Sequence, residues 1–151
     1  MRRLLPLGFI ALIYACAQET GNSNEEPINV PSIKIDCGDI IELRVVSELF
    51  SRLGEVAQAE EFADQDRDLF RFPLIIESGD DFTSISFEQL KEDTQNFMNF
   101  EDLRQISTMR PEDVQSGGYR GCFLARGKVW FELPVDGDNL QIVSFDRDME
   151  W

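Results

Sequence analysis

An apolar run near the N-terminus constrains this chain most, because it decides which residues are left to fold. Leu4–Tyr14 is the run, Arg2 and Arg3 precede it, and small residues follow it. These are the three parts of a secretory signal, whereas a stable membrane-spanning helix needs about 20 apolar residues. We therefore expect residues 1–15 to be a signal peptide that directs export.

The end of this run indicates how the signal is removed. Ile13–Cys16 (IYAC) resembles the lipobox of bacterial lipoproteins, which implies diacylation of Cys16 and cleavage before it, although a small residue is usual where Tyr14 stands. No aspartate follows Cys16, and the resemblance to enteric lipoproteins then implies a periplasmic protein anchored to the outer membrane. Alternatively, Ala15–Ala17 fits the A-x-A rule of ordinary signal peptidase, which releases a soluble secreted or periplasmic protein that begins at Gln18.

The rest of the chain divides into a tether and a domain. Residues 16–32 begin with the cysteine expected to carry lipid, and the polar residues after it have no apolar face to bury. Such a segment is typical of a flexible linker between an anchor and a domain. Residues 33–151, about 120 in number, are enough for one domain with a hydrophobic core, and many of the twelve phenylalanines of the chain lie there.

The charge of the chain excludes one large class of partners. The formal net charge is −15, and loss of Arg2 and Arg3 with the signal makes it more negative. Binding to phosphates needs the opposite sign, so we expect no nucleic-acid partner, and docking on anionic lipid headgroups is disfavoured for the same reason. A soluble, solvated surface explains the charge, as does an acidic face that meets a basic protein partner.

The complete absence of histidine removes the commonest general base, the Ser-His-Asp and Cys-His pairs and every histidine-based zinc or iron site. The acidic series Asp64, Asp66 and Asp68 does not replace them, because Leu69 and Ile75 stand where a calcium-binding EF-hand loop needs glycine and glutamate. We therefore predict no catalytic residues, no metal and no cofactor.

The cysteine count favours one disulfide. If Cys16 carries lipid, Cys37 and Cys122 remain, and an even number of cysteines in an oxidising compartment favours a bridge between them. The alternative is a pair of buried free thiols. The bridge would hold the start of the first helix to the sheet.

Hydrophobic spacing predicts that this helix starts at Asp39, with Glu42 completing a capping box, and ends near Phe62. Ile40 is expected on its buried face. Pro73 places the strand that follows at an edge or at a strand start. Two strands are expected next, at 72–77 and 82–86, around a turn at 78–81. A helix should then run from a Ser86–Gln89 capping box to about 97, followed by a shorter helix from 100 and a helical piece at Pro111. The chain should end in an antiparallel meander of strands at 119–125, 128–133 and 140–145.

Several local patterns fit one family. They are the sequences FPL at 72–74, ISFEQL at 85–90, GCFLARGKVWF at 121–131 and LQIV at 140–143. Together they resemble small periplasmic bacterial proteins of the nuclear transport factor 2-like superfamily, over about residues 39–145. The resemblance implies an α+β fold in which a long N-terminal helix and short helices pack on a curved, mainly antiparallel sheet, forming a cone that usually contains a pocket.

The same resemblance implies which residues could form a catalytic or ligand-binding site. Dehydratase-type members use histidine, which is absent, and isomerase-type members use aspartate with tyrosine, for which only Tyr119 is available after the signal. Tyr119 and Trp130 are therefore the candidate pocket residues, although ordinary packing explains both. We expect a non-catalytic binding or interaction domain; the alternatives are a small-ligand carrier or isomerase-like pocket enzyme of the same fold, and an acidic inhibitor of a basic enzyme.

Overall fold

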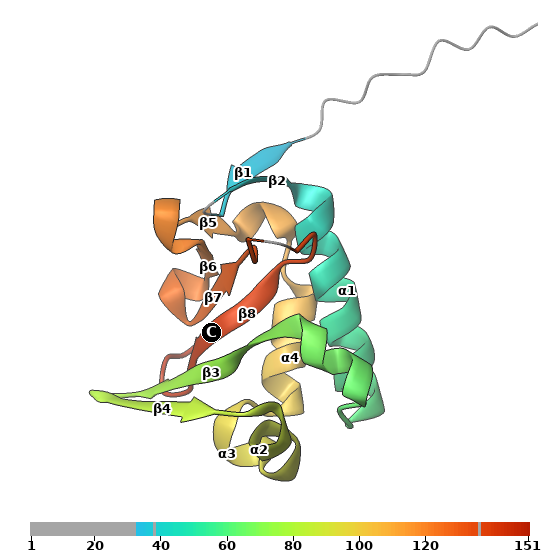
Figure 1. Ribbon diagram of the computed structural model, residues 1–151, viewed down its shortest axis with the longest axis vertical. Coiled ribbons are helices and arrows are strands. Elements are labelled where there is room, and N and C mark those ends of the chain that lie inside the picture. The colour runs from blue at the N-terminus through green and yellow to red at the C-terminus, as the bar shows by residue number, and fades with distance from the viewer. Residues whose placement is uncertain (1–32, 38, 136) are drawn as a thin grey trace, which may run out of the picture. The chain divides into compact units, whose positions relative to one another are not determined.

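A six-stranded sheet with helices on one face makes up most of the computed structural model (Figure 1), which describes residues 33–37, 39–135 and 137–151. The expected signal peptide, lipidated Cys16 and tether lie outside the described residues. In the order of the sheet, the strands are β4 (Asp81–Ile85), β3 (Phe70–Ser78), β8 (Gln141–Asp146), β7 (Val129–Glu132), β6 (Cys122–Leu124) and β5 (Gln115–Ser116).

The strand pairing confirms an α+β fold and the predicted meander. The last three strands, β6, β7 and β8, pair antiparallel in chain order. The sheet also contains one parallel pair, because the last strand, β8, lies beside β3, with Ile75 next to Ser144. The sheet is therefore mixed, and its other pairs are antiparallel.

The helices lie on one side of this sheet (Figure 1). The long helix α1 (Leu43–Ala59) packs against α4 (Phe100–Thr108), and both bury apolar residues in the common core. Two short helices, α2 (Phe87–Glu92) and α3 (Thr94–Phe97), follow β4. The 3₁₀ helices are Asp64–Leu69, Pro111–Asp113, Gly118–Arg120 and Ala125–Gly127.

The start of the folded part differs from the prediction. Residues before α1 form a hairpin of β1 (Lys34–Asp36) and β2 (Ile40–Glu42), and α1 begins at Leu43 without a side-chain cap. The capping box predicted at Asp39 is therefore wrong, as is the buried position of Ile40, which is 70% exposed. The helix ends at Ala59 instead of near Phe62, because Glu60 adopts a left-handed conformation with φ 53°.

Other expected boundaries are confirmed or corrected by local geometry. The Ser86–Gln89 capping box is present: Ser86 Oγ accepts from the Gln89 N–H at 3.3 Å, and Gln89 Oε1 accepts from the Ser86 N–H at 2.9 Å. The helix that it opens breaks at Asp93 into α2 and α3. The strand expected at 119–125 is shorter, because Gly121 has φ 95° and the residues before it form a 3₁₀ turn.

Pro73 does not mark an edge, since β3 lies between β4 and β8. Its peptide bond with Phe72 is cis, and it stands where the register between β3 and β8 shifts. Proline lacks the N–H that a regular ladder needs, so an interior strand accommodates it at such an irregularity.

Candidate binding surface

The two faces of the sheet carry different side chains. Successive residues of a strand point to opposite faces, and residues paired across strands share a face. The face against the helices is apolar and closed: Phe131 and Phe145 are at most 1% exposed. They share it with further buried side chains, namely Leu74, Ile76, Ile85, Leu124, Val129 and Ile142.

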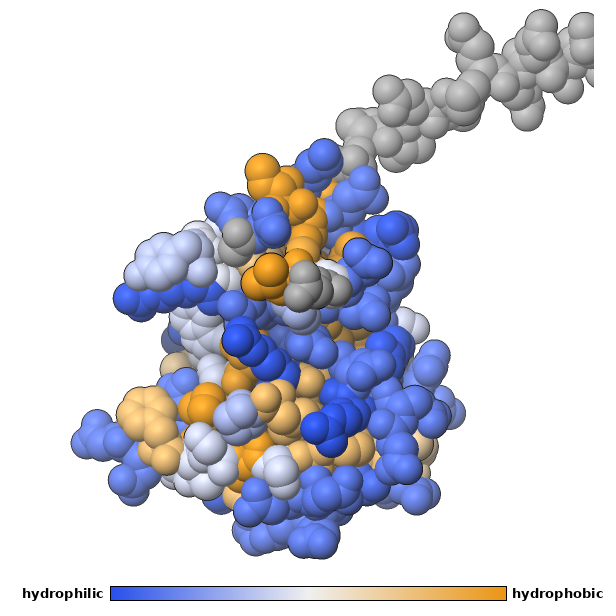
Figure 2. Space-filling view, in the orientation of Figure 1, coloured by the Kyte–Doolittle hydropathy of each residue, from blue (hydrophilic) through white to orange (hydrophobic). Residues whose placement is uncertain are grey.

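The opposite face, called the open face here, presents a row of partly exposed side chains. The strand register places Ile75 beside Ser144, Ser144 beside Trp130, and Trp130 beside Phe123. None of these four residues is fully buried. The row therefore crosses β3, β8, β7 and β6, and no α-helix of the described part of the chain lies over it. Figure 2 shows hydrophobic residues gathered over this part of the sheet, with hydrophilic residues around them.

An aromatic pair forms one end of this row. The rings of Phe123 and Trp130 have their centroids 5.0 Å apart with a tilt of 40°, within the range in which aromatic pairs attract each other. Gly117 makes room for the indole, because a Cβ there would lie 2.6 Å from the Trp130 ring. The pair is thus a packed, partly exposed platform.

A shallow hollow of about 260 Å³ lies beside the platform. It is lined by Glu77, Arg120, Trp130, Val143 and Ser144. Val143 is the residue at which the pairing of β8 with β7 shifts register. The hollow thus combines apolar side chains with one group of each charge, which suits surface recognition better than chemistry in a closed site.

Arg120 is the cation at the rim of this hollow. Its guanidinium lies 5.6 Å from the centre of the Tyr119 ring, and its Nε donates to Tyr119 Oη at 3.3 Å. Among the residues that the structure describes, Arg120 has no ion-pair partner. A stacked arginine of this kind keeps most of its hydrogen-bond donors available to a binding partner.

The two candidate pocket residues do not meet in an enclosed site. Tyr119 lies in a 3₁₀ turn and is 85% exposed. Trp130 is on the open face of the sheet, away from the α-helices. Within the described part of the chain, the buried polar side chains are Thr94 and Lys128, so no buried carboxylate stands near Tyr119.

The position of Lys128 differs from the one that strand alternation predicts. Strand alternation predicts it beside Trp130 and Glu132, but it precedes β7 and is 2% exposed. Its Nζ donates to the carbonyl oxygens of Asp146 and Met149 and lies 4.7 Å from the Phe145 ring. Burial lowers the pKa of Lys128, against the charges of nearby aspartates, which raise it.

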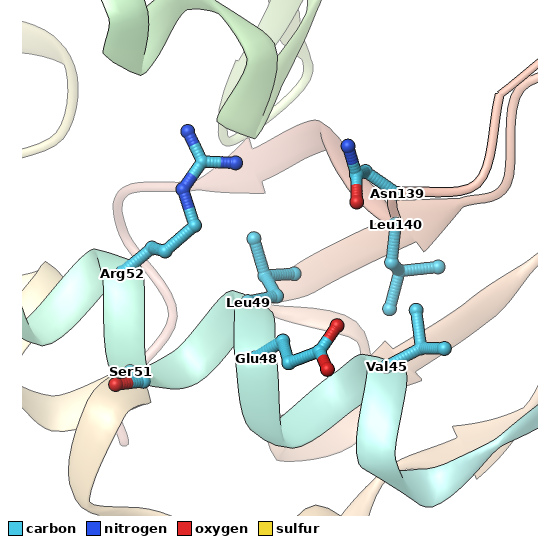
Figure 3. Close-up of a pocket in the computed structure, with 7 residues that line it drawn as sticks. All are labelled: Val45, Glu48, Leu49, Ser51, Arg52, Asn139 and Leu140. Carbon is cyan, nitrogen blue, oxygen red and sulfur yellow. The ribbon is translucent and has the colours of Figure 1, made fainter.

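Figure 3 shows a second hollow, of about 300 Å³, between α1 and the residues just before β8. Val45, Leu49 and Leu140 are its apolar residues, while Glu48 and Arg52 lie at its side. Arg52 donates to the Gln65 carbonyl oxygen at 3.3 Å. The residues that line this hollow offer a small apolar contact surface and no pair of side chains suited to acid–base catalysis.

Cys37 and Cys122 lie at the geometry that a disulfide requires. Their Cα atoms are 4.5 Å apart and their sulfur atoms are joined. Both residues are fully buried. Cys37 lies in the turn between β1 and β2, so the bridge connects this hairpin to β6, whereas the sequence predicted a direct connection to the first helix.

The acidic series that resembled a calcium loop forms other contacts. Asp64, Asp66 and Asp68 lie in a 3₁₀ helix. Asp64 accepts from Lys91 Nζ at 2.9 Å, and this hydrogen bond lowers the pKa of the Asp64 carboxyl. Across the described residues, no group of three or more Cys, Asp or Glu side chains is placed to hold a metal ion.

No family model, curated protein or solved structure matches this chain. In the described ranges, none of the helices has the length and apolar character needed to cross a membrane.

Proposed function

We propose that this chain is an exported lipoprotein, anchored in the periplasm to the outer membrane through Cys16, whose domain binds a protein partner and is not an enzyme. The observation that carries the second part is the contrast between the sheet faces. Side chains fill the space between sheet and helices, while the open face presents an aromatic platform and a shallow hollow.

We further propose that the domain has the cone-shaped fold of the nuclear transport factor 2-like superfamily. A long helix, a strand hairpin, short helices and an antiparallel meander follow one another, and this order is compatible with the nuclear transport factor 2-like superfamily, which the local sequence patterns resemble. In such a fold the cone usually contains a pocket. Here Phe50 and Phe131, with ring centroids 6.2 Å apart, lie in the core between α1 and β7. A filled cone favours interaction over a small-ligand carrier or an isomerase-like enzyme.

The anchoring part is tested by fractionation and mass spectrometry of the mature protein. Cys16→Ser should move the protein from the membrane fraction to the soluble fraction, because two acyl chains suffice for stable anchoring. Tyr14→Ala is the matched control, since it brings the sequence closer to the lipobox and should leave the protein in the membrane. An unmodified mature protein that starts at Gln18 would contradict the proposal.

The binding part is tested by site-specific photo-crosslinking in cells with the full chain. A photoreactive residue at Val143, in the hollow of the open face, should give a defined crosslinked product. The control position is Gln58, which is exposed on α1. Equal products from both positions, or none from any position on the open face, would refute a partner-binding face.

A further inference from the structure

The strand β4 forms one edge of the sheet and is unusually open. Among the described residues it pairs with β3 alone. Four successive residues, Asp81 to Ser84, are exposed, and Phe82 is 69% exposed. Figure 1 shows the hairpin of β3 and β4 extending beyond the helices at its turn.

The edge is also regular. The pairing of β4 with β3 continues without a shift from Ser78–Asp81 at the turn to Leu74–Ile85. In an antiparallel pair, alternate residues direct their N–H and C=O groups toward the partner strand, so the others direct theirs outward. Natural edges are usually blocked by charged residues, especially lysine, or by proline, a bulge or a cover. β4 (DFTSI) carries no lysine and no proline, and its one charged residue is Asp81 beside the turn.

Negative charge surrounds this edge. Asp80 and Asp81 lie at the hairpin turn, and the register places Glu77 beside both Phe82 and Asp146. Asp148 joins them, because its carboxylate accepts from Ser78 Oγ at 2.7 Å. Arg147 is the basic residue of this stretch, and its Nε lies 3.9 Å from the Asp148 carboxylate. It therefore offsets one charge, and the carboxylates of Glu77, Asp80, Asp81 and Asp146 leave this edge negative.

We propose that β4 receives an added strand from a positively charged, extended segment of a protein partner. This inference rests on the proposed binding function and names the element and the chemistry of the partner. Strand addition satisfies the outward backbone groups of the edge, and alternate side chains of the added strand provide specificity. The segment should place an apolar side chain beside Phe82 and lysine or arginine beside the aspartates of the turn.

The charge also argues against a second copy of this chain as the occupant. Two copies would bring together chains of net charge −15 each, and like charges at an interface oppose association. A basic segment instead gains from the same field, both in affinity and in the rate of encounter.

A peptide probe tests the chemistry. The probe is a nine-residue peptide that alternates lysine with valine, and its control alternates glutamate with valine; binding to the mature protein is measured by fluorescence anisotropy. Asp80→Asn with Asp81→Asn should weaken binding of the lysine peptide about tenfold and reduce its salt dependence. The matched control, Glu55→Gln with Glu61→Gln, removes two exposed carboxylates from another surface and should leave binding unchanged. Equal weakening by both pairs would overturn the inference.

Hydrogen exchange tests the location. Addition of the lysine peptide should slow exchange of those backbone amides in Phe82–Ser84 that point away from β3, because they gain partners in the new strand. Protection confined to β6 and β7, or a concentration-dependent dimer that protects β4 without peptide, would overturn strand addition by a basic segment.

Crosslinking in cells separates this inference from the function on which it rests. A photoreactive residue at Phe82 should capture a partner segment whose sequence, read by mass spectrometry, contains alternating basic residues. Products from Val143 with none from Phe82, or a captured segment without basic residues, would overturn the inference and retain the binding function. Products from neither position would reject both.

Discussion

The two faces of the sheet differ more than the alternation of the strands alone requires. Neighbouring residues such as Trp130 and Phe131 are both large and aromatic, yet Phe131 is fully buried and Trp130 is partly exposed. The covered face holds the fold together, since nearly all of its side chains are apolar and enclosed. The open face carries apolar side chains that remain partly exposed, and these are available to contact a partner.

The largest expected effect concerns the disulfide at the covered face. Cys122→Ala should lower the free energy of unfolding by about 4 to 5 kcal/mol in the chain-entropy description, because the bridge closes a long loop between residues 85 positions apart. Urea unfolding of the wild type in oxidising and reducing buffer measures it. Reduction should have little effect on the variant, and equal stability of the oxidised and reduced wild type would show that the bridge does not form.

A pair of matched truncations compares the two faces directly. Phe131→Ala should cost about 4 kcal/mol, because it leaves a cavity in a closed core. Phe123→Ala should cost only about 1 kcal/mol, since it removes a partly exposed aromatic contact with Trp130. The measurement is the urea midpoint of each variant. Similar losses would mean that the open face also stabilises the fold, and the argument for a surface kept for binding would fail.

The smallest expected effect comes from Lys128, the charged side chain buried against Phe145. Burial lowers its pKa in the folded state, so the unfolded chain binds the proton more tightly. Stability contributed by this residue therefore rises with pH through the interval between the folded pKa and the ordinary lysine value of about 10.4.

The pH effect is isolated by comparing the wild type with Lys128→Met at pH 8, 9 and 10. The difference between their free energies of unfolding should change in favour of the wild type as the pH rises. This comparison also cancels the contribution of Lys91, whose pKa is raised by its hydrogen bond with Asp64. Parallel pH profiles would show that the ammonium group is not held in a desolvated site.

The sequence predicted best where the cause of structure is local. The Ser86–Gln89 capping box, the turn at 78–81 and the order of the meander strands follow from side chains a few residues apart, and all are present. The capping pattern at Asp39 and Glu42 was misleading, because those residues take part in a hairpin with β1, whose pairing no local signal indicates.

The remaining errors involve partners that are distant in sequence. Pro73 lies in an interior strand because β8 returns beside β3, and Lys128 is buried because carbonyl groups of Asp146 and Met149 accept its hydrogen bonds. The open-face row was also missed, since Ile75 and Trp130 become neighbours only through Ser144. Hydrophobic periodicity predicts which face of a strand each residue occupies, but it does not predict which strands lie side by side.

The parallel pairing of β3 with β8 has a consequence for how the chain folds. Ile75 and Ser144 are about 70 residues apart in the sequence, and contacts of this kind raise the contact order and slow folding. While β8 is still missing, β3 and β4 form a hairpin with two unpaired edges, and isolated two-stranded hairpins are only marginally stable. During that interval the chain is exposed to aggregation and proteolysis, so a chaperone would protect this protein most before β8 has docked.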